Sequence, residues 1–220
     1  MKQRIVLLGP PASGKGTQAD RLSDTFGIPH VSTGALLRAE CSLGTSFGRE
    51  ADSWTSKGLL IPDDLAIRII HSWIAEHGTS FLFDGFPRSI DQAEHLDEEL
   101  AALHAPLDLI LLLELGDDEV HRRIFDRLSC LHCGATYAGT LHGYVEGMRC
   151  PRCEAVLIRR NDDTAEALER RMTVYRELTE PVVGYYERTV PNLLHRLDAG
   201  QGSDAVFATI SRLVSQNTRR

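Results

Sequence analysis

The 220 residues suffice for one compact domain with a sizeable core, and 42% apolar and 25% charged residues are ordinary for a globular protein. The formal charge of −7 argues against a general nucleic-acid binder, although a negative total can hide a local basic cleft. The apolar run after Arg4 is too short for a secretory signal, and the longest apolar stretch, 107–115, contains two acids. We therefore expect a cytoplasmic protein with no membrane partner.

A glycine-bearing loop follows the first predicted strand. The apolar run 5–8 predicts a buried strand, residues 9–17 read GPPASGKGT, and a helix is predicted over 16–26. Such a loop turns backbone N–H groups inward, the helix adds the positive end of its dipole, and Lys15 supplies a charge for outer phosphates. The loop predicts a nucleoside triphosphate site. Gly16 stands where the common P-loop pattern has Ser or Thr directly after lysine, and this variant points to small nucleoside monophosphate kinases.

Strands alternate with helices through the rest of the chain. Further strands are predicted at 28–31, 81–83, 109–113 and 193–197, and helices at 34–41, 47–57, 63–77, 89–103, 117–128, 164–189 and 203–216. Strands that are apolar throughout predict a parallel sheet covered on both faces, with ligands at the carboxyl ends of the strands. Two stretches depart from this rhythm, 33–60 and the turn-rich 130–160, and both resemble lids or binding modules.

Four cysteines form two Cys-x-x-Cys knuckles, separated by sixteen residues. Four thiolates complete a closed tetrahedron around Zn²⁺ without a position for water, so we expect a structural metal held by Cys130, Cys133, Cys150 and Cys153. Two redox dithiols or incidental cysteines are the alternatives. His132 and His142 are possible substitute ligands that we expect to face solvent, and Cys41 has no partner nearby in the sequence.

A second polar motif, 84–88 (DGFPR), follows the third predicted strand. Asp84 at a strand end can orient magnesium-bound water, Gly85 permits close approach, and Arg88 can grip a phosphate with two parallel hydrogen bonds. Gln92 lies one helical turn beyond Arg88, where its amide can read a base edge. Arg123 and Arg127 share a face of the helix predicted at 117–128. Singly these arginines are ordinary surface residues, but together with the loop they suit phosphoryl transfer, which needs alignment and positive charge.

These motifs resemble those of the adenylate kinase family, in its bacterial type with a zinc site in the lid. The carriers are 9–17 with Gln18, 32–34 with Leu37 and Arg38, 84–88 with Gln92, and then Arg123, Arg127, Arg160, Asp162, Asp163, Arg171 and 181–186. The resemblance runs from about residue 4 to Asp198. It implies a P-loop nucleoside triphosphate hydrolase-like α/β fold, in which a parallel five-stranded sheet is flanked by helices. It divides the chain into a core (1–31, 62–127 and 164–220), a helical AMP-binding insertion (32–61, the acceptor segment) and a zinc-bearing lid (128–163, the cysteine segment).

The resemblance also implies an activity and a site. The activity is reversible transfer of the terminal phosphoryl group from Mg²⁺–ATP to AMP, giving two ADP, by a monomer with structural Zn²⁺. Catalytic charge is expected from Lys15, Arg38, Arg88, Arg127, Arg160 and Arg171. ATP contacts are expected from Ala12, Ser13, Gly14, Lys15, Gly16, Thr17, Arg127, Thr136, Tyr137 and Gln201. AMP contacts are expected from Thr33, Arg38, Leu59, Leu60, Ile61, Gly85, Phe86, Pro87, Arg88, Gln92, Arg160 and Arg171.

The chain departs from the family pattern at four positions. Ala12 replaces a loop glycine, which costs about 1 kcal/mol if that position needs a positive φ. Ala35 replaces an aspartate, Leu128 an arginine and Asn161 a lysine. Two other functions remain open at this point. One is a kinase for UMP or CMP, and the other is a zinc-ribbon P-loop module that binds nucleotide without kinase activity.

Overall fold

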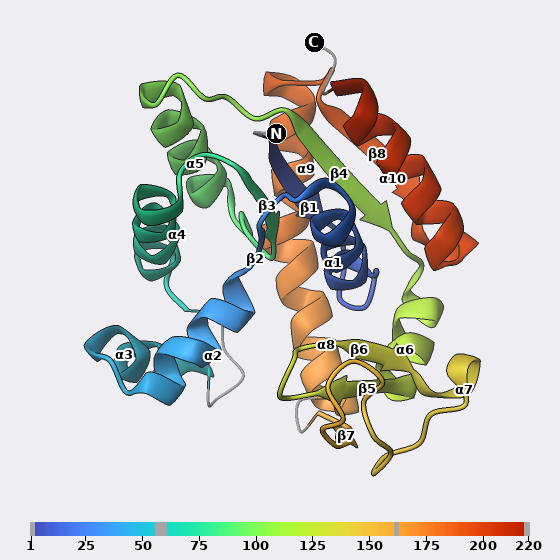
Figure 1. Ribbon diagram of the computed structural model, residues 1–220. Helices are drawn as coiled ribbons and strands as arrows, with labels where there is room; N and C mark the ends of the chain where they lie inside the picture. The colour runs from blue at the N-terminus through green and yellow to red at the C-terminus, as the bar shows by residue number, and fades with distance from the viewer. Residues whose placement is uncertain (1–2, 56–60, 161–162, 218–220) are drawn as a thin grey trace.

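The computed structural model describes residues 3–55, 61–160 and 163–217, and its centre is a five-stranded parallel sheet (Figure 1). The strands lie in the spatial order β2 (His30–Ser32), β3 (Phe81–Asp84), β1 (Arg4–Leu8), β4 (Leu109–Glu114) and β8 (Leu194–Asp198). Each neighbouring pair is parallel. The predicted parallel five-stranded sheet is therefore confirmed, and the strand ends differ from the predicted ones by one or two residues.

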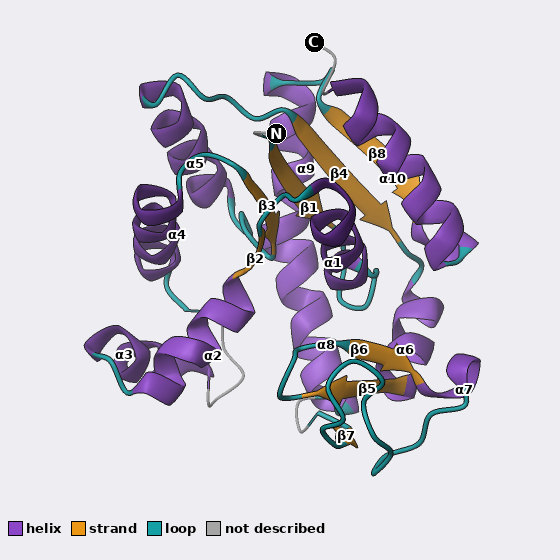
Figure 2. Cartoon of the chain, viewed as in Figure 1, coloured by secondary structure: helices purple, strands orange, loops and turns teal. Residues whose placement is uncertain are grey.

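Helices cover both faces of this sheet, as Figure 2 shows. The covering helices are α1 (Lys15–Phe26), α4 (Asp63–His77), α5 (Ile90–Ala102), α9 (Glu180–Thr189) and α10 (Ser203–Asn217). None of the helices in the described ranges has both the length and the apolar character needed to cross a bilayer.

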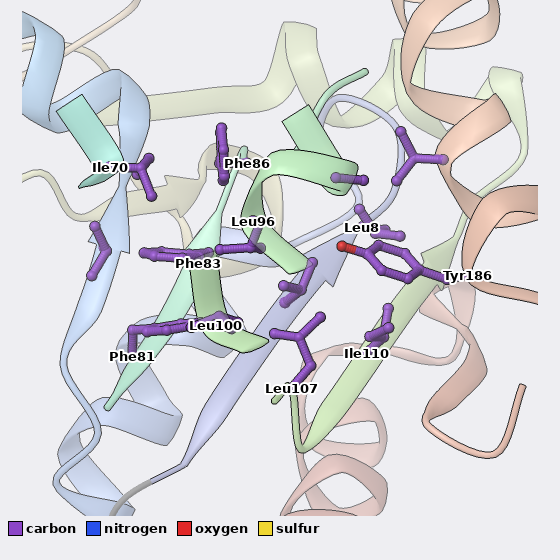
Figure 3. Close-up of a cluster of buried hydrophobic side chains, with 14 of the residues drawn as sticks. Leu8, Ile70, Phe81, Phe83, Phe86, Leu96, Leu100, Leu107, Ile110 and Tyr186 are labelled. Atoms are coloured by element: carbon purple, nitrogen blue, oxygen red, sulfur yellow. The ribbon is translucent and has the colours of Figure 1, made fainter. Parts of the chain in front are cut away.

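Alternate residues of β1 enter two different cores because side chains in a strand alternate between its faces. Val6 and Leu8 pack with α4, α5 and α9 in a cluster that contains Phe83 (Figure 3). Ile5 and Leu7 pack with α1 and α10. Burial on both faces fixes the sheet rigidly, so the loops at its carboxyl edge start from defined positions.

The acceptor segment forms a helical hairpin of α2 (Thr33–Leu43) and α3 (Ser46–Thr55), which Figure 1 shows extending away from the sheet. Ser32 caps α2, since its side chain accepts a hydrogen bond from the Ala35 N–H at 3.4 Å. A Cβ atom on Gly48 would lie 2.0 Å from the Glu40 carbonyl oxygen. Glycine at this position therefore allows the two helices to pack closely.

The cysteine segment carries a separate antiparallel sheet of β5 (Arg127–Cys130), β6 (Thr136–Ala138) and β7 (Leu157–Ile158), with the short α7 (Gly139–His142). The helix predicted over 117–128 is wrong at its end, because α6 (Asp117–Asp126) stops earlier and Arg127 opens β5. The helix face predicted for Arg123 with Arg127 is therefore also wrong. Pairing of Arg127 with Ala138 recruits these residues into the sheet, and local helix propensity does not reveal such long-range pairing.

The helix predicted over 164–189 is divided into α8 (Ala165–Val174), the π-helical turn η1 (Tyr175–Thr179) and α9. Pro181 lies in the first turn of α9 and has no N–H to donate to the preceding turn. The missing hydrogen bond explains the local widening, because π-helical turns occur where the regular ladder is interrupted.

Candidate nucleotide site

The loop between β1 and α1 folds around the ammonium of Lys15. Lys15 Nζ donates to the carbonyls of Gly9 and Pro10, each at 2.8 Å, and lies 3.4 Å from Ser13 Oγ. Gly9 has φ +143°, and a Cβ atom there would lie 2.5 Å from the Leu113 carbonyl oxygen. Close packing against β4 thus requires glycine at the start of the loop. The ammonium occupies a concave loop at the N-terminus of a helix, a position suited to phosphate.

Ala12 takes a left-handed backbone conformation with φ +57°. The family pattern has glycine here, and glycine adopts such angles without steric penalty. The replacement therefore places about 1 kcal/mol of backbone strain in the phosphate loop.

Charged side chains from several elements surround Lys15. Burial, together with the positive charges of Arg88, Arg171 and Arg127, lowers the pKa of Lys15 to about 8 against the opposing effect of Asp84. Burial would raise the pKa of Asp84, but interactions with His30 and Lys15 outweigh it and hold the pKa below its ordinary value. The site thus contains a charged carboxylate beside an excess of cations, which favours a polyanion over a neutral ligand.

Gly16 is the residue at which this loop departs from the common P-loop pattern, and its surroundings explain the departure. A Cβ atom at Gly16 would lie 3.3 Å from Asp84 Oδ2. The missing side chain lets the Asp84 carboxylate approach the first turn of α1. The close approach of the Asp84 carboxylate to the backbone of Gly16 accounts for glycine at this position.

His30 connects Asp84 to α1. His30 Nδ1 lies 2.8 Å from Asp20 Oδ1, and Nε2 lies 3.8 Å from Asp84 Oδ2, which is an ion-pair distance rather than a hydrogen bond. Burial alone would lower the pKa of His30, but the two carboxylates raise it to about 9. Asp20 also lies 3.7 Å from Arg152 in the cysteine segment. No local sequence pattern marks His30, because its two carboxylates come from distant segments of the chain.

The Gly85 carbonyl joins the acceptor segment to Arg88. It accepts hydrogen bonds from Thr33 Oγ1 at 2.9 Å and from Arg88 Nε at 2.8 Å. Gly85 has φ +86°, and a Cβ atom there would lie 2.8 Å from Arg88 Nη2. Burial lowers the pKa of Arg88 against the opposing effect of Asp84. The start of α2 and a buried guanidinium are thereby held at one strand end.

The remaining predicted AMP residues are placed as follows. Phe86 and Pro87 are buried, and Ile61 packs against the core cluster that contains Phe83. Arg38 lies in α2 near Gly34, at which a Cβ atom would come within 3.2 Å of Arg38 Nη1. Leu59 and Leu60 lie outside the described residues. Gln92 is 4% exposed, and its amide contacts the Arg88 N–H and Asp63.

The carboxylate of Asp163 contacts two of the predicted catalytic arginines. Arg127 donates to its carboxylate through Nε at 3.0 Å and through Nη2, and Arg171 Nη1 lies 3.7 Å from Oδ1. The Asp163 side chain is only 5% exposed. The Arg160 carbonyl accepts the Asp163 N–H at 3.0 Å, so the backbone of Arg160 joins the same turn. In the sequence, Asp163 is one of the residues that carry the family resemblance but has no expected role, and only its acidic pair with Asp162 marks it.

Besides Arg127, the predicted ATP residues outside the loop lie in two places. Thr136 is exposed on β6, and the Tyr137 hydroxyl lies 3.3 Å from Cys150 Sγ, so that side chain points toward the cysteines. Gln201 is exposed, and its amide nitrogen donates to Asp198 at 3.3 Å. Arg123 donates to the Ala199 carbonyl at 2.8 Å and lies 3.5 Å from the Ala12 carbonyl. Arg123 therefore ties the phosphate loop to the turn after β8.

The four predicted metal ligands form one cluster, Cys130, Cys133, Cys150 and Cys153, with all sulfurs within 4.8 Å of one another. The Cys130–Cys153 and Cys133–Cys150 sulfur distances are 3.4 and 3.7 Å, and all four thiols are free. Four bonds of about 2.3 Å to Zn²⁺ in a tetrahedron place the sulfurs about 3.8 Å apart. The cluster thus fits Zn²⁺, whereas His132 and His142 are exposed, as expected.

Comparison with known proteins identifies relatives along nearly the whole chain. The sequence profile of a family described as adenylate kinase matches residues 7–190. An adenylate kinase of Methanosarcina barkeri is 40% identical over 214 residues, which cover 96% of this chain and 98% of the relative. The adenylate kinases of Thermodesulfovibrio yellowstonii and Archaeoglobus fulgidus are 37% and 36% identical, over 97% and 96% of this chain and 99% and 98% of each relative.

Proposed function

The chain belongs to the adenylate kinase family and transfers the terminal phosphoryl group of ATP to AMP, giving two ADP. On that premise we propose that the two nucleotides bind end to end at the carboxyl edge of the central sheet. The observation that carries this proposal is the convergence on Lys15 of the charges of Asp84, Arg88, Arg127 and Arg171.

On the ATP side, residues 12–17 surround the phosphates. The Lys15 ammonium exchanges its bonds to the Gly9 and Pro10 carbonyls for bonds to phosphate oxygens. Added phosphate charge favours the protonated lysine, because opposite charge raises a pKa that burial and neighbouring cations have lowered. Mg²⁺ enters with ATP as part of the substrate, and the charged Asp84 is the residue that would hold its hydration water.

On the AMP side, Arg88 and Arg38 bind the acceptor phosphate, Thr33 and residues 59–61 line the nucleoside, and Gln92 faces the base. The Gly85 carbonyl supports this arrangement because it holds both Thr33 and Arg88. Arg127, Arg160 and Arg171 place positive charge around the moving phosphoryl group. Transfer needs little covalent work from the protein, so alignment and charge supply most of the rate enhancement.

We assign the acceptor segment (32–61) to AMP binding, the cysteine segment (128–163) to a lid, and residues 1–31, 62–127 and 164–220 to the core. Arg127 lies at the boundary between core and lid, where it opens the first strand of the lid sheet, and closure of the lid over ATP excludes water and suppresses hydrolysis. Thr136 and Tyr137 meet ATP from the lid side, and Gln201 meets it from the core. The four cysteines would hold Zn²⁺, which supplies rigidity to a segment with little apolar core of its own. Free thiols suit a reducing cytoplasm, in which we expect a monomer.

A coupled assay that offers Mg²⁺–ATP with AMP, GMP, CMP and UMP in turn tests this function. We expect ADP formation that depends strictly on the monophosphate and is fastest with AMP. ATP turnover without any monophosphate would instead fit a nucleotide-binding module, and a preference for UMP or CMP would fit the other kinase. Lys15→Met should lower the rate by several orders of magnitude while the thermal unfolding curve keeps its shape, because a site charge is lost but no core contact.

A further inference from the structure

The Gln92 amide is held at both of its ends. Its Oε1 accepts the Arg88 backbone N–H at 2.8 Å, and its Nε2 donates to Asp63 Oδ1 at 2.6 Å. A backbone N–H can only donate and a carboxylate can only accept, so the two partners fix which end of the amide carries oxygen. Asp63 thereby determines the orientation of a side chain that lies outside its own helix.

Asp63 is itself anchored at its second oxygen. Asp63 Oδ2 accepts a hydrogen bond from the Ser89 hydroxyl at 2.6 Å. Ser89 Oγ in turn accepts a hydrogen bond from the backbone N–H of Gln92 at 3.2 Å and so caps the N-terminus of α5. Ser89 is 9% exposed and Gln92 is 4% exposed. The three side chains form a closed ring between the first turns of α4 and α5. Full burial of the Ser89–Gln92 bond and partial burial of the two bonds to Asp63 make these hydrogen bonds costly to leave unmade.

One donor and one acceptor remain on Gln92 after these bonds. A primary amide has two N–H groups and two oxygen lone pairs; Asp63 accepts from one N–H, and the Arg88 N–H donates to one lone pair. The remaining pair matches adenine, in which the 6-amino group donates and N1 accepts. Hypoxanthine and guanine present the reverse order, with an accepting O6 and a donating N1–H. Cytosine shares the order of adenine, and uracil shares that of hypoxanthine.

We propose that Asp63 is a positioning residue that sets acceptor-base selectivity, since it locks the Gln92 amide in the orientation that pairs with amino bases and rejects oxo bases. A flipped amide would turn its NH₂ toward the Arg88 N–H and its oxygen toward the Asp63 carboxylate. Both contacts are repulsive and at least partly shielded from water, so the flip that hypoxanthine requires is disfavoured. The inference rests on the proposed function, in which Gln92 faces the base of AMP.

AMP and IMP provide the test, because their bases differ at the 6-substituent and at protonation of N1. We would measure kcat/KM for AMP, IMP and CMP with the wild type, Asp63→Asn and Asp63→Ala. Asparagine keeps the shape of aspartate but offers both a donor and an acceptor, so it no longer opposes the flipped orientation of Gln92, and only the Arg88 N–H then holds the amide. We expect the AMP-to-IMP ratio to fall at least tenfold in both variants, on the order of one lost hydrogen bond to a charged group. The AMP-to-CMP ratio should change little, because both bases share one pattern.

Asp64→Asn is the matched control. Asp64 lies in the same first turn of α4, is 74% exposed and pairs only loosely with Arg68 at 3.6 Å. It shares with Asp63 the favourable interaction with the helix dipole but has no contact with Gln92 among the described residues. The Asp64→Asn variant should keep the wild-type AMP-to-IMP ratio.

Two outcomes separate the inference from its premise. If Gln92→Ala lowers the AMP-to-IMP ratio and both Asp63 variants leave it unchanged while activity falls equally for every acceptor, Asp63 has only a structural role and the inference is wrong. If Gln92→Ala itself leaves the ratio unchanged, the placement of the AMP base is wrong. Far-UV circular dichroism of each variant confirms that the ratios compare folded enzymes.

Discussion

His30→Gln tests the charge network behind the phosphate site. The imidazole is 18% exposed and lies between Asp20 and Asp84. Burial alone would lower the pKa of His30, but the two carboxylates raise it to about 9 from the ordinary 6.5. Glutamine retains hydrogen-bonding capacity in a side chain of similar size but cannot carry the positive charge. The substitution therefore removes the charge and little else.

The expected magnitude follows from the pKa. At about 1.4 kcal/mol per pKa unit, the difference between 6.5 and about 9 corresponds to roughly 3 kcal/mol of folding stability. The folded state binds this proton more tightly than the unfolded chain. The contribution is therefore fully present below pH 6.5 and is lost as the pH rises through about 9.

The titration of Lys15 changes the folding stability in the opposite direction over part of the same pH range. Its pKa is lowered to about 8 from 10.5, so the unfolded chain binds this proton more tightly and stability rises between these values. The wild-type stability curve therefore understates the loss due to His30. The quantity to measure is the difference between wild type and His30→Gln, repeated in a Lys15→Met background.

Urea unfolding between about pH 6 and pH 10 gives this difference. We expect the free energy of unfolding of wild type minus that of His30→Gln to shrink by roughly 3 kcal/mol across the range. His71→Gln is the control, because His71 pairs with Glu99 at 2.9 Å but is 67% exposed, and an exposed pair contributes little. A difference that stays constant with pH would refute the assignment of a charged His30.

Three further outcomes are expected. Ala12→Gly should raise the free energy of unfolding by about 1 kcal/mol in urea titrations, since glycine relieves the left-handed strain; an unchanged or lower value would contradict it. Cys150→Ala should abolish zinc binding, measured by atomic absorption, and lower the thermal midpoint more than the rate at moderate temperature; a folded but inactive variant would show that the metal has a further role. Asp163→Asn should lower kcat by about 10²-fold in steady-state assays, because Arg127 and Arg171 lose their shared carboxylate; unchanged kcat would remove Asp163 from the site.

Local patterns predicted much of this molecule correctly. The apolar runs of β1, β3 and β4 identify buried parallel strands, because strands covered on both faces have no polar positions to alternate. The Cys-x-x-Cys spacing predicts that the two thiols of each motif point toward a common centre, because two intervening residues are enough for the backbone to turn. Each of these signals is contained within a few consecutive residues.

Other features depend on partners that are remote in the chain. The local sequence predicts Arg127 to be helical, but in the structure it pairs with Ala138 in a sheet and binds Asp163, which is 36 residues away. In the sequence, Asp63 resembles any acidic residue in the first turn of a helix. Its role becomes visible only in the structure, where Gln92, 29 residues away, donates a hydrogen bond to it. His30 acquires its charge only when Asp20 and Asp84 approach it from both sides.

Local sequence patterns thus predicted the layered sheet, the phosphate loop and the four-cysteine cluster, because each depends on the spacing of residues within a short stretch of the chain. The burial of Asp163, the orientation of the Gln92 amide and the protonation of His30 were decided by packing. Electrostatic and hydrogen-bond energies depend on which charges and dipoles end within a few ångströms of each other and on how much water remains between them. Those quantities exist only once distant segments have been brought together.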